Sequence, residues 1–571
     1  MDVDPRTGSL RSLLRGTRLG TPFAALVTAS GVSNLLMLTG PLFMMQVYDR
    51  VLGSGSLPTL WVLTTLVAGL FACYGVFETV RSRLTSRIAE VLDDRLRGPL
   101  FALSVRARLV AGVVDRADPS RDGDVLRRFV AGPAPLALLD LPWVPVYVTA
   151  VFLLHPVLGW VTLAGAGVAV LLLVAGELLT RERLRSATEH QLRRQTLVDE
   201  SRQSAESVLG MSMLTALGDR LDGVAAESRT DLLRATDRAG TVSAASRAFR
   251  FFLQSAVLAT GAWLVLRGEL SGGVMIASSV ITSRALAPVD QVVGQWRSID
   301  QARAAWRRVR AMLAAEPRPG TTTSLPRPTG PIELDGAAVG PPGARTPVLR
   351  QVTFSLAAGD GLAVVGPSGA GKSALARGLV GAWPVLAGEY RVDGADLAQY
   401  DPAVHAGLVG YLPQDVGLLS GTVAQNIARF ATRADPGTIV AAARAAQVHD
   451  LIVRLPHGYD TPVGPSGLHL SAGQRQRIGL ARALHGDPHL IVLDEPNAHL
   501  DHEGEQALTA AIRAARDGGA VVVAVVHRRG VLAGLSHVLV LADGAQSSFG
   551  PISTISAAGA RQRATTAQSA S

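Results

Sequence analysis

Six apolar segments occupy the first half of the chain, and each is long enough to cross about 30 Å of hydrocarbon as a helix. They run from Pro22 to Val47, Leu57 to Phe77, Pro133 to Leu154, Val157 to Gly176, Phe251 to Leu266 and Gly272 to Pro288. The links after the second and fourth segments are long and have helical periodicity, which predicts helices that continue well beyond the bilayer. The pattern therefore predicts a six-span helical membrane domain at residues 22–315, preceded by a tail at residues 1–21.

The distribution of arginine orients this domain. Most arginines of the first half lie in the N-terminal tail and the two long links, whereas Arg50 and Arg267 are expected on the opposite side. Because basic residues stay on the cytoplasmic side, both termini are expected in the cytoplasm. The apolar run that begins at Pro22 is too long for a cleaved signal peptide, so the chain is expected to remain in the membrane whole.

The second half has a different pattern. Residues 331–551 alternate short apolar strands with helices, which predicts an α/β domain. Residues 316–330 are rich in proline and threonine and are expected to be a linker. Residues 552–571 are rich in Ala, Ser, Thr and Gln, a composition typical of a disordered tail.

Composition supports a membrane protein, because 48% of the residues are hydrophobic and only 18% are charged. The net charge of +9 does not indicate nucleic-acid binding, since the arginines lie between apolar segments and form no single basic face. The single cysteine, Cys73, excludes an intrachain disulfide and a cysteine-based metal site.

Asp140 is the charged residue closest to a predicted span, in the segment Leu138-Leu139-Asp140-Leu141-Pro142-Trp143. It could line a translocation path, as charged residues in membrane spans often do. It could also cap the helix that restarts at Pro142, and this second interpretation is favoured.

Lys372 is the only lysine among 55 lysine and arginine residues, and it lies in a glycine-rich loop between the apolar strand 362–365 and a helical segment. The loop and its flanking serine are Gly366, Pro367, Ser368, Gly369, Ala370, Gly371, Lys372 and Ser373. Backbone N–H groups and the helix N-terminus would hold phosphates, while Lys372 adds a compact charge that a planar guanidinium cannot replace. The Ser373 hydroxyl is placed to bind Mg²⁺. This phosphate loop alone does not separate a pump from a GTPase or a kinase.

The segment Leu470 to Arg477 resembles the signature motif of ATP-binding-cassette (ABC) proteins. The resemblance assigns Ser471, Gly473 and Gln474 to ATP held by a second cassette. A short helix later, four apolar residues lead to Asp494 and Glu495. The end of such a strand would present Asp494 to the Mg²⁺ shell and Glu495 to an attacking water.

Three more positions match ABC motifs. Gln414 resembles the Q-loop residue that contacts the γ-phosphate and Mg²⁺, Asp501 resembles the D-loop aspartate, and His527 resembles the switch histidine. The resemblance implies ATP and Mg²⁺ as cofactors and a catalytic set of Glu495, His527 and Lys372.

Two departures from the ABC pattern bear on nucleotide binding. Ala472 stands where the signature usually has glycine, and the segment from Val339 to Pro342 lacks the aromatic residue that stacks on adenine in many cassettes. The affinity for ATP in the closed state and the selectivity for the adenine base are therefore left undecided by the sequence. The residues expected to act on the phosphates are present. His499 in the D-loop has no assigned role and is taken as a surface histidine.

Segments outside the ATP site narrow the family. Pro41 to Leu52, Asp140 to Trp143 and Tyr411 to Val416 resemble type I secretion permease/ATPases, particularly the protease and haemophore exporter group. The resemblance, from about Pro22 to Gly550, implies a six-span type I ABC exporter domain followed by an α/β P-loop nucleotide-binding domain. It also implies a homodimer in the bacterial inner membrane with two ATP sites at its interface and a cytoplasmic ATPase domain.

The same resemblance implies the cargo and the partners. The transporter would move unfolded polypeptides, commonly calcium-binding repeat (RTX) proteins with a C-terminal signal, with a periplasmic adaptor and a TolC-like outer-membrane channel. Membrane lipid would surround it. About twenty residues precede the first span, so the N-terminal cysteine peptidase domain of some bacteriocin exporters, and its leader cleavage, are not expected.

The segment from Val208 to Asp219, in the second long link, is expected to be the coupling helix that docks on a cassette. Met211, Met213 and Leu214 could equally be ordinary packing residues. Two other functions remain open for the whole chain. A flippase for lipids or amphiphiles would share the ATP site and the six spans, and a non-transporting regulatory ATPase would share the fold.

Overall fold

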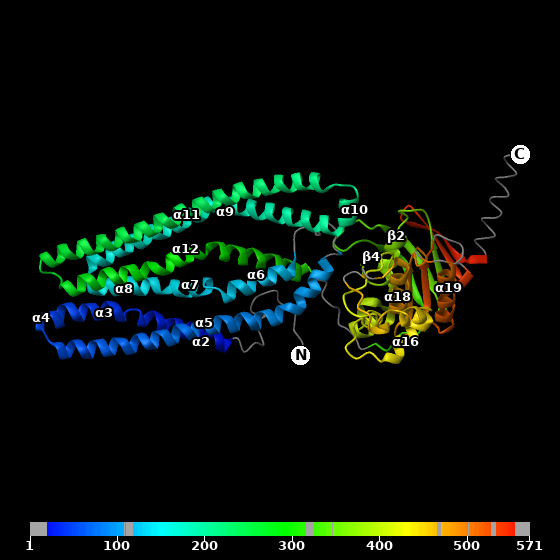
Figure 1. The fold of residues 1–571 in the computed structure, drawn as a ribbon, viewed down its shortest axis with the longest axis horizontal. Coiled ribbons are helices and arrows are strands. Elements are labelled where there is room, and N and C mark those ends of the chain that lie inside the picture. Colours follow the sequence, from blue (N-terminus) through cyan, green and yellow to red (C-terminus); the bar gives the residue numbers. More distant parts are fainter. Residues whose placement is uncertain are drawn as a thin grey trace. The chain divides into compact units, whose positions relative to one another are not determined.

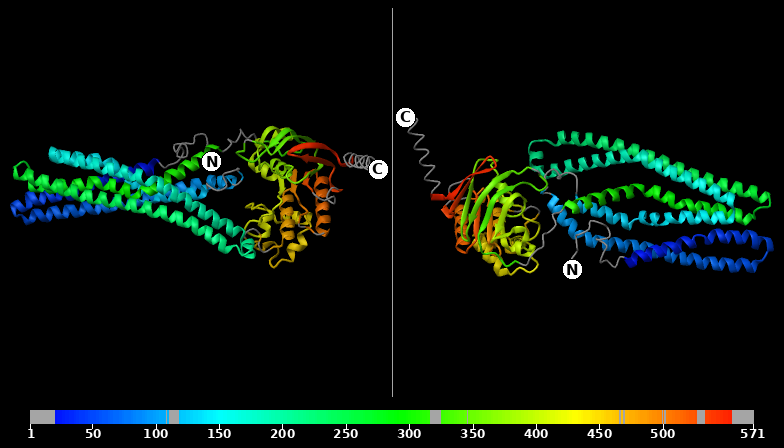
Figure 2. Two further views of the ribbon diagram at one scale, coloured as in Figure 1. Left: turned by 90° about the horizontal axis from the view of Figure 1, so that it is seen from above. Right: turned by 180° about the vertical axis from the view of Figure 1, so that it is seen from behind.

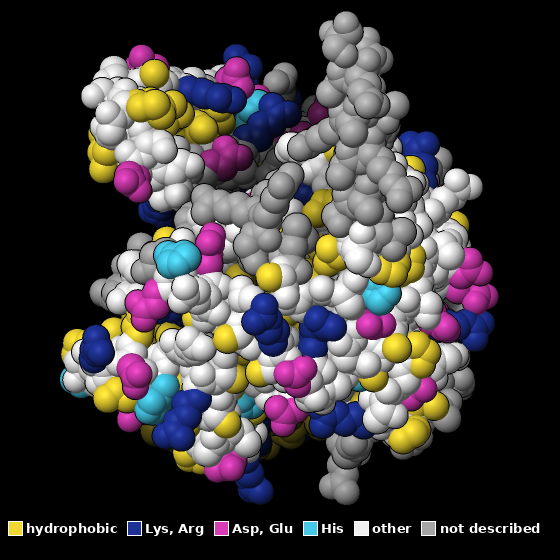
Figure 3. Space-filling model, turned by 90° about the vertical axis from the view of Figure 1, so that its right-hand side faces the viewer, with side chains coloured by type: hydrophobic (Ala, Val, Ile, Leu, Met, Phe, Trp, Pro, Cys, Tyr) yellow, Lys and Arg dark blue, Asp and Glu magenta, His cyan; other side chains and the backbone are white. Residues whose placement is uncertain are grey.

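The computed structural model describes residues 20–107, 109, 118–315, 325–344, 346–464, 467, 470–498, 500, 502–526 and 533–553. Contacts within the chain define two compact units (Figure 1). The first unit is Met1–Arg108 with Val113–Glu316, and the second is Leu109–Gly112 with Pro317–Ser571. On the face drawn in Figure 3, acidic and basic side chains are interspersed among apolar ones.

The described part of the first unit is helical. Its elements are α2 (Gly20–Leu36), α3 (Thr39–Gln46), the π-helix η1 (Val47–Val51), α4 (Leu52–Ser54), α5 (Leu57–Ala107), α6 (Pro119–Ala131), α7 (Ala134–Asp140), the 3₁₀ turn η2 (Leu141–Trp143), α8 (Val144–Leu154), α9 (Pro156–Gln203), α10 (Ala205–Gly210), α11 (Leu214–Leu266) and α12 (Gly272–Ala315). Among the described helices, six runs are long and apolar enough to cross a membrane, which confirms the predicted count.

Four of these helices are much longer than a bilayer requires. The helices α5, α9, α11 and α12 have 51, 48, 53 and 44 residues, against the roughly 20 residues that span the hydrocarbon. Figures 1 and 2 show α9 and α11 side by side. The predicted extension of the helices beyond the apolar segments is therefore present.

The first and third spans are interrupted; the restart of the third at Pro142 was expected, whereas the apolar pattern did not predict the break in the first. The first breaks at Met37 and Leu38, between α2 and α3. Pro41 accounts for the break, because a proline ring clashes with the carbonyl four residues earlier, here that of Met37. The third span passes through the 3₁₀ turn η2, which contains Pro142 and is followed by Pro145.

The second unit is a sheet with helices. Its strands are β1 (Ile332–Val339), β2 (Leu349–Leu356), β3 (Gly361–Val365), β4 (Val385–Val392), β5 (Ala395–Asp396), β6 (Val409–Leu412), β7 (Leu490–Asp494), β8 (Val521–Val525), β9 (His537–Ala542) and β10 (Ala545–Pro551). Its helices are α13 (Lys372–Leu379), the 3₁₀ turn η3 (Leu397–Gln399), α14 (Pro402–Leu408), α15 (Val423–Ile427), α16 (Pro436–Ala445), α17 (His449–Val453), the 3₁₀ turn η4 (Gly458–Asp460), α18 (Ala472–Leu484) and α19 (His502–Asp517).

The order of the strands explains where the site forms. In the described residues the sheet order is β5-β4-β1-β2-β10-β9-β3-β8-β7-β6. The strands β3, β8, β7 and β6 are neighbours and run parallel, and all residues of β7 and β8 are buried. The carboxyl ends of parallel strands meet at one edge of a sheet, so the loops after β3, β6 and β7 converge there.

Candidate functional site: a nucleotide-binding edge and a polar membrane network

The phosphate loop leaves β3 at Val365 and enters α13 at Lys372. Gly369 and Gly371 have φ angles of 82° and 95°, in the left-handed region that glycine adopts without a steric penalty. A side chain at Gly366 would collide with the backbone carbonyl oxygen of Leu541. These glycines are therefore required by the backbone path of the loop.

Lys372 is 6% exposed and fills the centre of this loop. Its Nζ donates hydrogen bonds to the carbonyl oxygens of Gly366, at 2.8 Å, and Pro367, at 2.9 Å. The ammonium is thus held by the loop itself, at the place where the phosphates of a nucleotide would need a positive charge. A bound phosphate would compete with these two carbonyl groups for the ammonium.

Asp494 lies at the end of β7 and is 1% exposed. The Ser373 hydroxyl donates to its Oδ1 at 3.4 Å. Burial raises the pKa of Asp494; the Ser373 hydrogen bond opposes this effect, and the neighbouring Glu495 carboxylate adds to it. A hydroxyl and a buried carboxylate beside a phosphate loop are the hard oxygen ligands that Mg²⁺ prefers, and a dication would offset the cost of ionising Asp494. The residues present therefore fit Mg²⁺.

Gln414 and Glu495 contact each other. Gln414 follows β6, and its Nε2 donates a hydrogen bond to Glu495 Oε2 at 3.1 Å. Glu495 has a φ of 51°, unusual for a residue other than glycine, and its N–H donates to the carbonyl of Val525 on β8. The structure thus gathers the phosphate loop, Gln414, Asp494 and Glu495 at one edge of the sheet.

The signature segment forms the start of a helix. Ser471 is the N-cap of α18: its hydroxyl accepts from the N–H of Gln474, and Gln474 Oε1 accepts from the N–H of Ser471. This capping box has the pattern S-x-x-Q, a sequence signal that motif matching overlooked. The first turn, with Ala472 and Gly473, presents backbone N–H groups that suit an anion. In the described part of the chain no hydrogen bond joins the signature residues to the phosphate loop.

One further residue was missed by the motif reading. Gln476 is 2% exposed, and its Nε2 donates to the carbonyl oxygen of Pro496 at 3.1 Å. It therefore ties the signature helix α18 to the loop that carries Glu495. Asp501 and His527, and the unassigned His499, lie outside the described residues. Val339, in the segment that lacks an aromatic residue, is 1% exposed at the end of β1 and offers adenine little surface.

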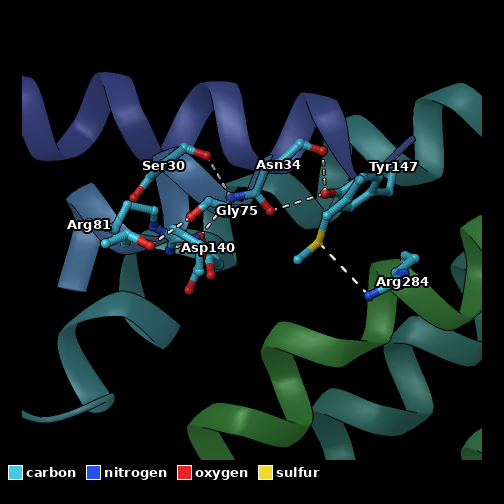
Figure 4. A network of polar contacts seen from close by, with 10 residues as sticks. Ser30, Asn34, Gly75, Arg81, Asp140, Tyr147 and Arg284 are labelled. Atoms are coloured by element: carbon cyan, nitrogen blue, oxygen red, sulfur yellow. Dashed lines mark hydrogen bonds and ion pairs between the residues drawn. The ribbon is translucent and has the colours of Figure 1, made fainter. Parts of the chain in front are cut away.

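The favoured interpretation of Asp140 as a helix cap is wrong. Its side chain makes no capping hydrogen bond at η2. Instead, Oδ1 accepts from Arg81 Nη2 at 2.8 Å and from Asn34 Nδ2 at 2.7 Å (Figure 4). The guanidinium and the amide supply the charge-assisted hydrogen bonds that backbone N–H groups would supply in a cap. Arg81, which lies in the arginine-rich link after the second apolar segment, is 2% exposed within this pair.

Asp49 gives a physical role to the Pro41 to Leu52 segment. Its carboxylate accepts hydrogen bonds from the Ser271 hydroxyl at 2.6 Å and from the N–H of Gly273 at 2.8 Å. Asp49 thus caps the start of α12 and joins the end of the first span to the beginning of the sixth.

The predicted coupling segment is not one helix. The helix α10 ends at Gly210 and α11 begins at Leu214, with Ser212 at a φ of 54° in the turn between them. Met211 and Leu214 are 65% and 61% exposed. Both side chains are largely exposed to solvent within their own unit.

Comparison with known proteins places this arrangement in a class. The ABC transporter family model matches residues 349–498. The solved structure of a bacterial Atm1-family ABC exporter with ATP bound superposes with a TM-score of 0.79 and 21% sequence identity, over 94% of this chain and 96% of that one. The fold is that of an ABC exporter: a multi-pass membrane unit followed by an ATP-binding unit.

Sequence relatives define the family more narrowly. The type I secretion system ATP-binding protein PrsD of Rhizobium meliloti (strain 1021) is 46% identical over 93% of this chain and 91% of its own length. The cyclolysin secretion/processing ATP-binding protein CyaB of Bordetella pertussis is 28% identical, over 92% of this chain and 75% of its own length. The chain belongs to the family of type I secretion ATP-binding proteins, as the motifs indicated. It is an ATPase coupled to transport.

Proposed function

We propose that two copies of this chain form an inner-membrane exporter that moves unfolded polypeptides out of the cell with the energy of ATP hydrolysis. The observation that carries this proposal is the 46% identity to a type I secretion ATP-binding protein over 93% of the chain. The names of other relatives refer to the secretion of cyclolysin and the translocation of leukotoxin. We extend to this chain the periplasmic adaptor, the TolC-like outer channel and RTX-type cargo with a C-terminal signal.

The geometry at the sheet edge supports a specific division of labour in hydrolysis. Gly366–Ser373 would hold the phosphates of ATP, with Lys372 leaving its loop carbonyls for the nucleotide. Ser373, Asp494 and Gln414 would hold Mg²⁺, which screens the phosphate charge when bound. Glu495 would accept a proton from the attacking water, while Gln414 fixes the orientation of its carboxylate.

The signature residues support the proposal of a dimer. Ser471, Gly473 and Gln474 form a helix start suited to an anion, yet they make no hydrogen bond to their own phosphate loop in the described residues. We propose that they complete the ATP site of a second copy, together with Asp501, and that His527 contacts the γ-phosphate. Closure on ATP and release after hydrolysis would then alternate the access of the membrane unit.

The turn between α10 and α11 is proposed as the coupling element. Its exposed apolar side chains, Leu209, Met211 and Leu214, have no packing partner in their own unit that would hide them from water. An apolar tip at the end of two long helices suits docking on an ATP-binding unit. The distribution of arginine supports our proposal that this tip, both termini and the ATPase domain, residues 331–551, lie in the cytoplasm.

The test is quantitative proteomics of culture supernatants from the host strain that carries Lys372→Ala, compared with wild type. We expect the selective loss of one or a few polypeptides that have no cleaved N-terminal signal. An unchanged set of secreted proteins, while the wild-type chain is produced, would contradict polypeptide export and favour a lipid or small-molecule substrate.

A further inference from the structure

An arginine lies inside the sixth span, where a charge is costly. Arg284 is twelve residues into α12, which begins at Gly272, so it lies about 18 Å along the helix. The hydrocarbon layer is about 30 Å thick, which places Arg284 at membrane depth. Charged residues at such depth generally face the interior of the bundle or an aqueous path, because lipid does not solvate them.

The side chain of Arg284 is exposed within the chain, and it turns toward the first span. Its Nη1 lies 4.0 Å from Sδ of Met37, which is only a weak acceptor (Figure 4). Among the described residues no carboxylate lies within ion-pair distance of this guanidinium. Side chains on a helix lean toward its N-terminus. The headgroups at the C-terminal end of the sixth span lie in the opposite direction, so the Arg284 side chain does not lean toward them.

The acidic residue within the predicted spans contacts a different arginine. Asp140 is the only acidic residue in the six predicted spans, and Glu78 follows directly after the second. Both are bound to Arg81, at 2.8 Å and 3.0 Å. A second copy of the chain would have the same pairs. Because no described carboxylate reaches the Arg284 guanidinium, it is open to an anion from another molecule.

The break in the first span, which Arg284 faces through Met37, adjoins a polar network that is incompletely bonded. Met37 lies at the break between α2 and α3, where the Asn34 carbonyl accepts from the Tyr147 hydroxyl at 2.8 Å. Asn34 also binds Asp140 beside η2, so the network joins the two interrupted spans (Figure 4). Three buried atoms around it have no hydrogen-bond partner: Ser30 Oγ, Ser33 Oγ and Arg81 Nε. Interrupted helices and unpaired polar groups at membrane depth are typical of a binding site.

We infer that Arg284 and the interrupted first and third spans form a binding site in the translocation path for the carboxylate side chains of the transported chain. This inference rests on the proposed export of polypeptides. Arg81 has a separate role, because it binds Asp140, the one acidic residue within the predicted spans. Arg284 therefore remains available to a carboxylate of the transported chain. The site would favour acidic segments of the cargo over neutral ones.

The test measures the binding of two labelled peptides to the full-length protein in nanodiscs of zwitterionic lipid, by fluorescence anisotropy. One peptide alternates glycine with aspartate, and the other alternates glycine with asparagine. The wild type is expected to bind the aspartate peptide about tenfold more tightly, the effect of one charge-assisted pair. Arg284→Gln should remove this preference, and Arg284→Lys should keep most of it.

A matched control is Arg310→Gln, at an exposed position on the same helix beyond the predicted span, which should leave the preference unchanged. An aspartate preference that survives in Arg284→Gln would overturn the inference while leaving polypeptide export in place. If the wild type hydrolyses ATP but binds neither peptide, polypeptide transport itself is contradicted, and this inference falls with it.

A lipid phosphate is the competing source of an anion. The ATPase activity of wild type and Arg284→Gln is therefore compared in nanodiscs with and without anionic lipid. We expect both proteins to respond equally to the lipid. A lipid response lost in Arg284→Gln, with the peptide preference intact, would assign the guanidinium to a headgroup and contradict the inference.

Discussion

The side-chain amide of Gln414 donates a hydrogen bond to the carboxylate of Glu495, with 3.1 Å between Nε2 and Oε2. The two residues follow neighbouring parallel strands, β6 and β7. After Gln414 the chain continues into the helices α15 to α18, which include the signature helix. A shift of those helices would therefore change the orientation of the carboxylate proposed to activate water.

Glu495→Gln should abolish ATP hydrolysis without abolishing ATP binding. The amide cannot accept the proton of the attacking water, so turnover should fall by at least about 100-fold while two copies remain closed around ATP. Steady-state ATPase assays, with native mass spectrometry of the ATP-bound form, measure both effects. Glu503→Gln, at an exposed position on α19, is the control and should keep normal turnover. Normal hydrolysis by Glu495→Gln would refute the assigned role.

Lys372→Arg should lose hydrolysis although the charge is retained. Lys372 is buried, and its Nζ is held between the carbonyl oxygens of Gly366 and Pro367, a space that a planar guanidinium does not fit. We expect a loss of roughly 100-fold or more in turnover, as for other groups that stabilise developing charge. The control is Arg350→Lys, the reverse exchange at an exposed position on β2, and it should leave the turnover of ATP unchanged. Near-normal turnover in Lys372→Arg would show that charge alone is sufficient.

Asp494→Asn should inactivate the enzyme but stabilise it in the absence of nucleotide. Burial raises the pKa of Asp494, so the folded state disfavours its ionised form and loses stability as pH rises through that pKa. An asparagine does not titrate, so the variant should melt at a higher temperature than wild type at pH 7.5. The gain should shrink as the pH is lowered toward the pKa of Asp494. A lower melting temperature for Asp494→Asn than for wild type at pH 7.5 would show that the carboxylate stabilises the folded protein.

Arg429→Ala should loosen the helix α18. The guanidinium donates to the carbonyl oxygens of Val409, Arg482, Ala483 and His485 at 3.0–3.1 Å, and so holds the C-terminal end of this helix. Its loss should lower the local opening free energy by about 2 kcal/mol. Hydrogen–deuterium exchange of α18 amides should then be roughly 30-fold faster, with Arg433→Ala as an exposed control. Unchanged exchange would mean that water replaces the arginine without cost.

The long periodic features of the fold could be predicted from the sequence, because each has a local physical cause. Apolar length gave the six spans, and the loop from Gly366 to Ser373 with the strand before Asp494 gave the α/β cassette. The restart of the third span at Pro142 was anticipated, but the break in the first span was missed, although Pro41 is visible in the sequence. Mean hydropathy registers whether a segment is apolar, and a single proline or a 3₁₀ turn hardly changes it.

The polar network was missed for a different reason. Asp140 next to Pro142 has the local signature of a cap, and only the folded bundle brings Arg81, from 59 residues away, within 2.8 Å of its carboxylate. The same holds for Asp49, whose partners Ser271 and Gly273 lie more than 200 positions away. Motif patterns specified the chemistry at Lys372 and Glu495, but Gln476 could be found only from its contact with the Pro496 carbonyl.

The central claim is that two copies share the ATP sites that drive transport, and heterodimers test it most directly. Two differently tagged copies are co-expressed and purified through both tags, one with Lys372→Ala and the other with Gly473→Asp. If each site joins the phosphate loop of one copy to the signature of the other, one site of the two is intact, and about half of the wild-type ATPase activity is expected. A heterodimer with both substitutions on one copy and none on the other should be inactive. The reverse pattern, with activity only in this second heterodimer, would place each complete site within a single chain and contradict the account.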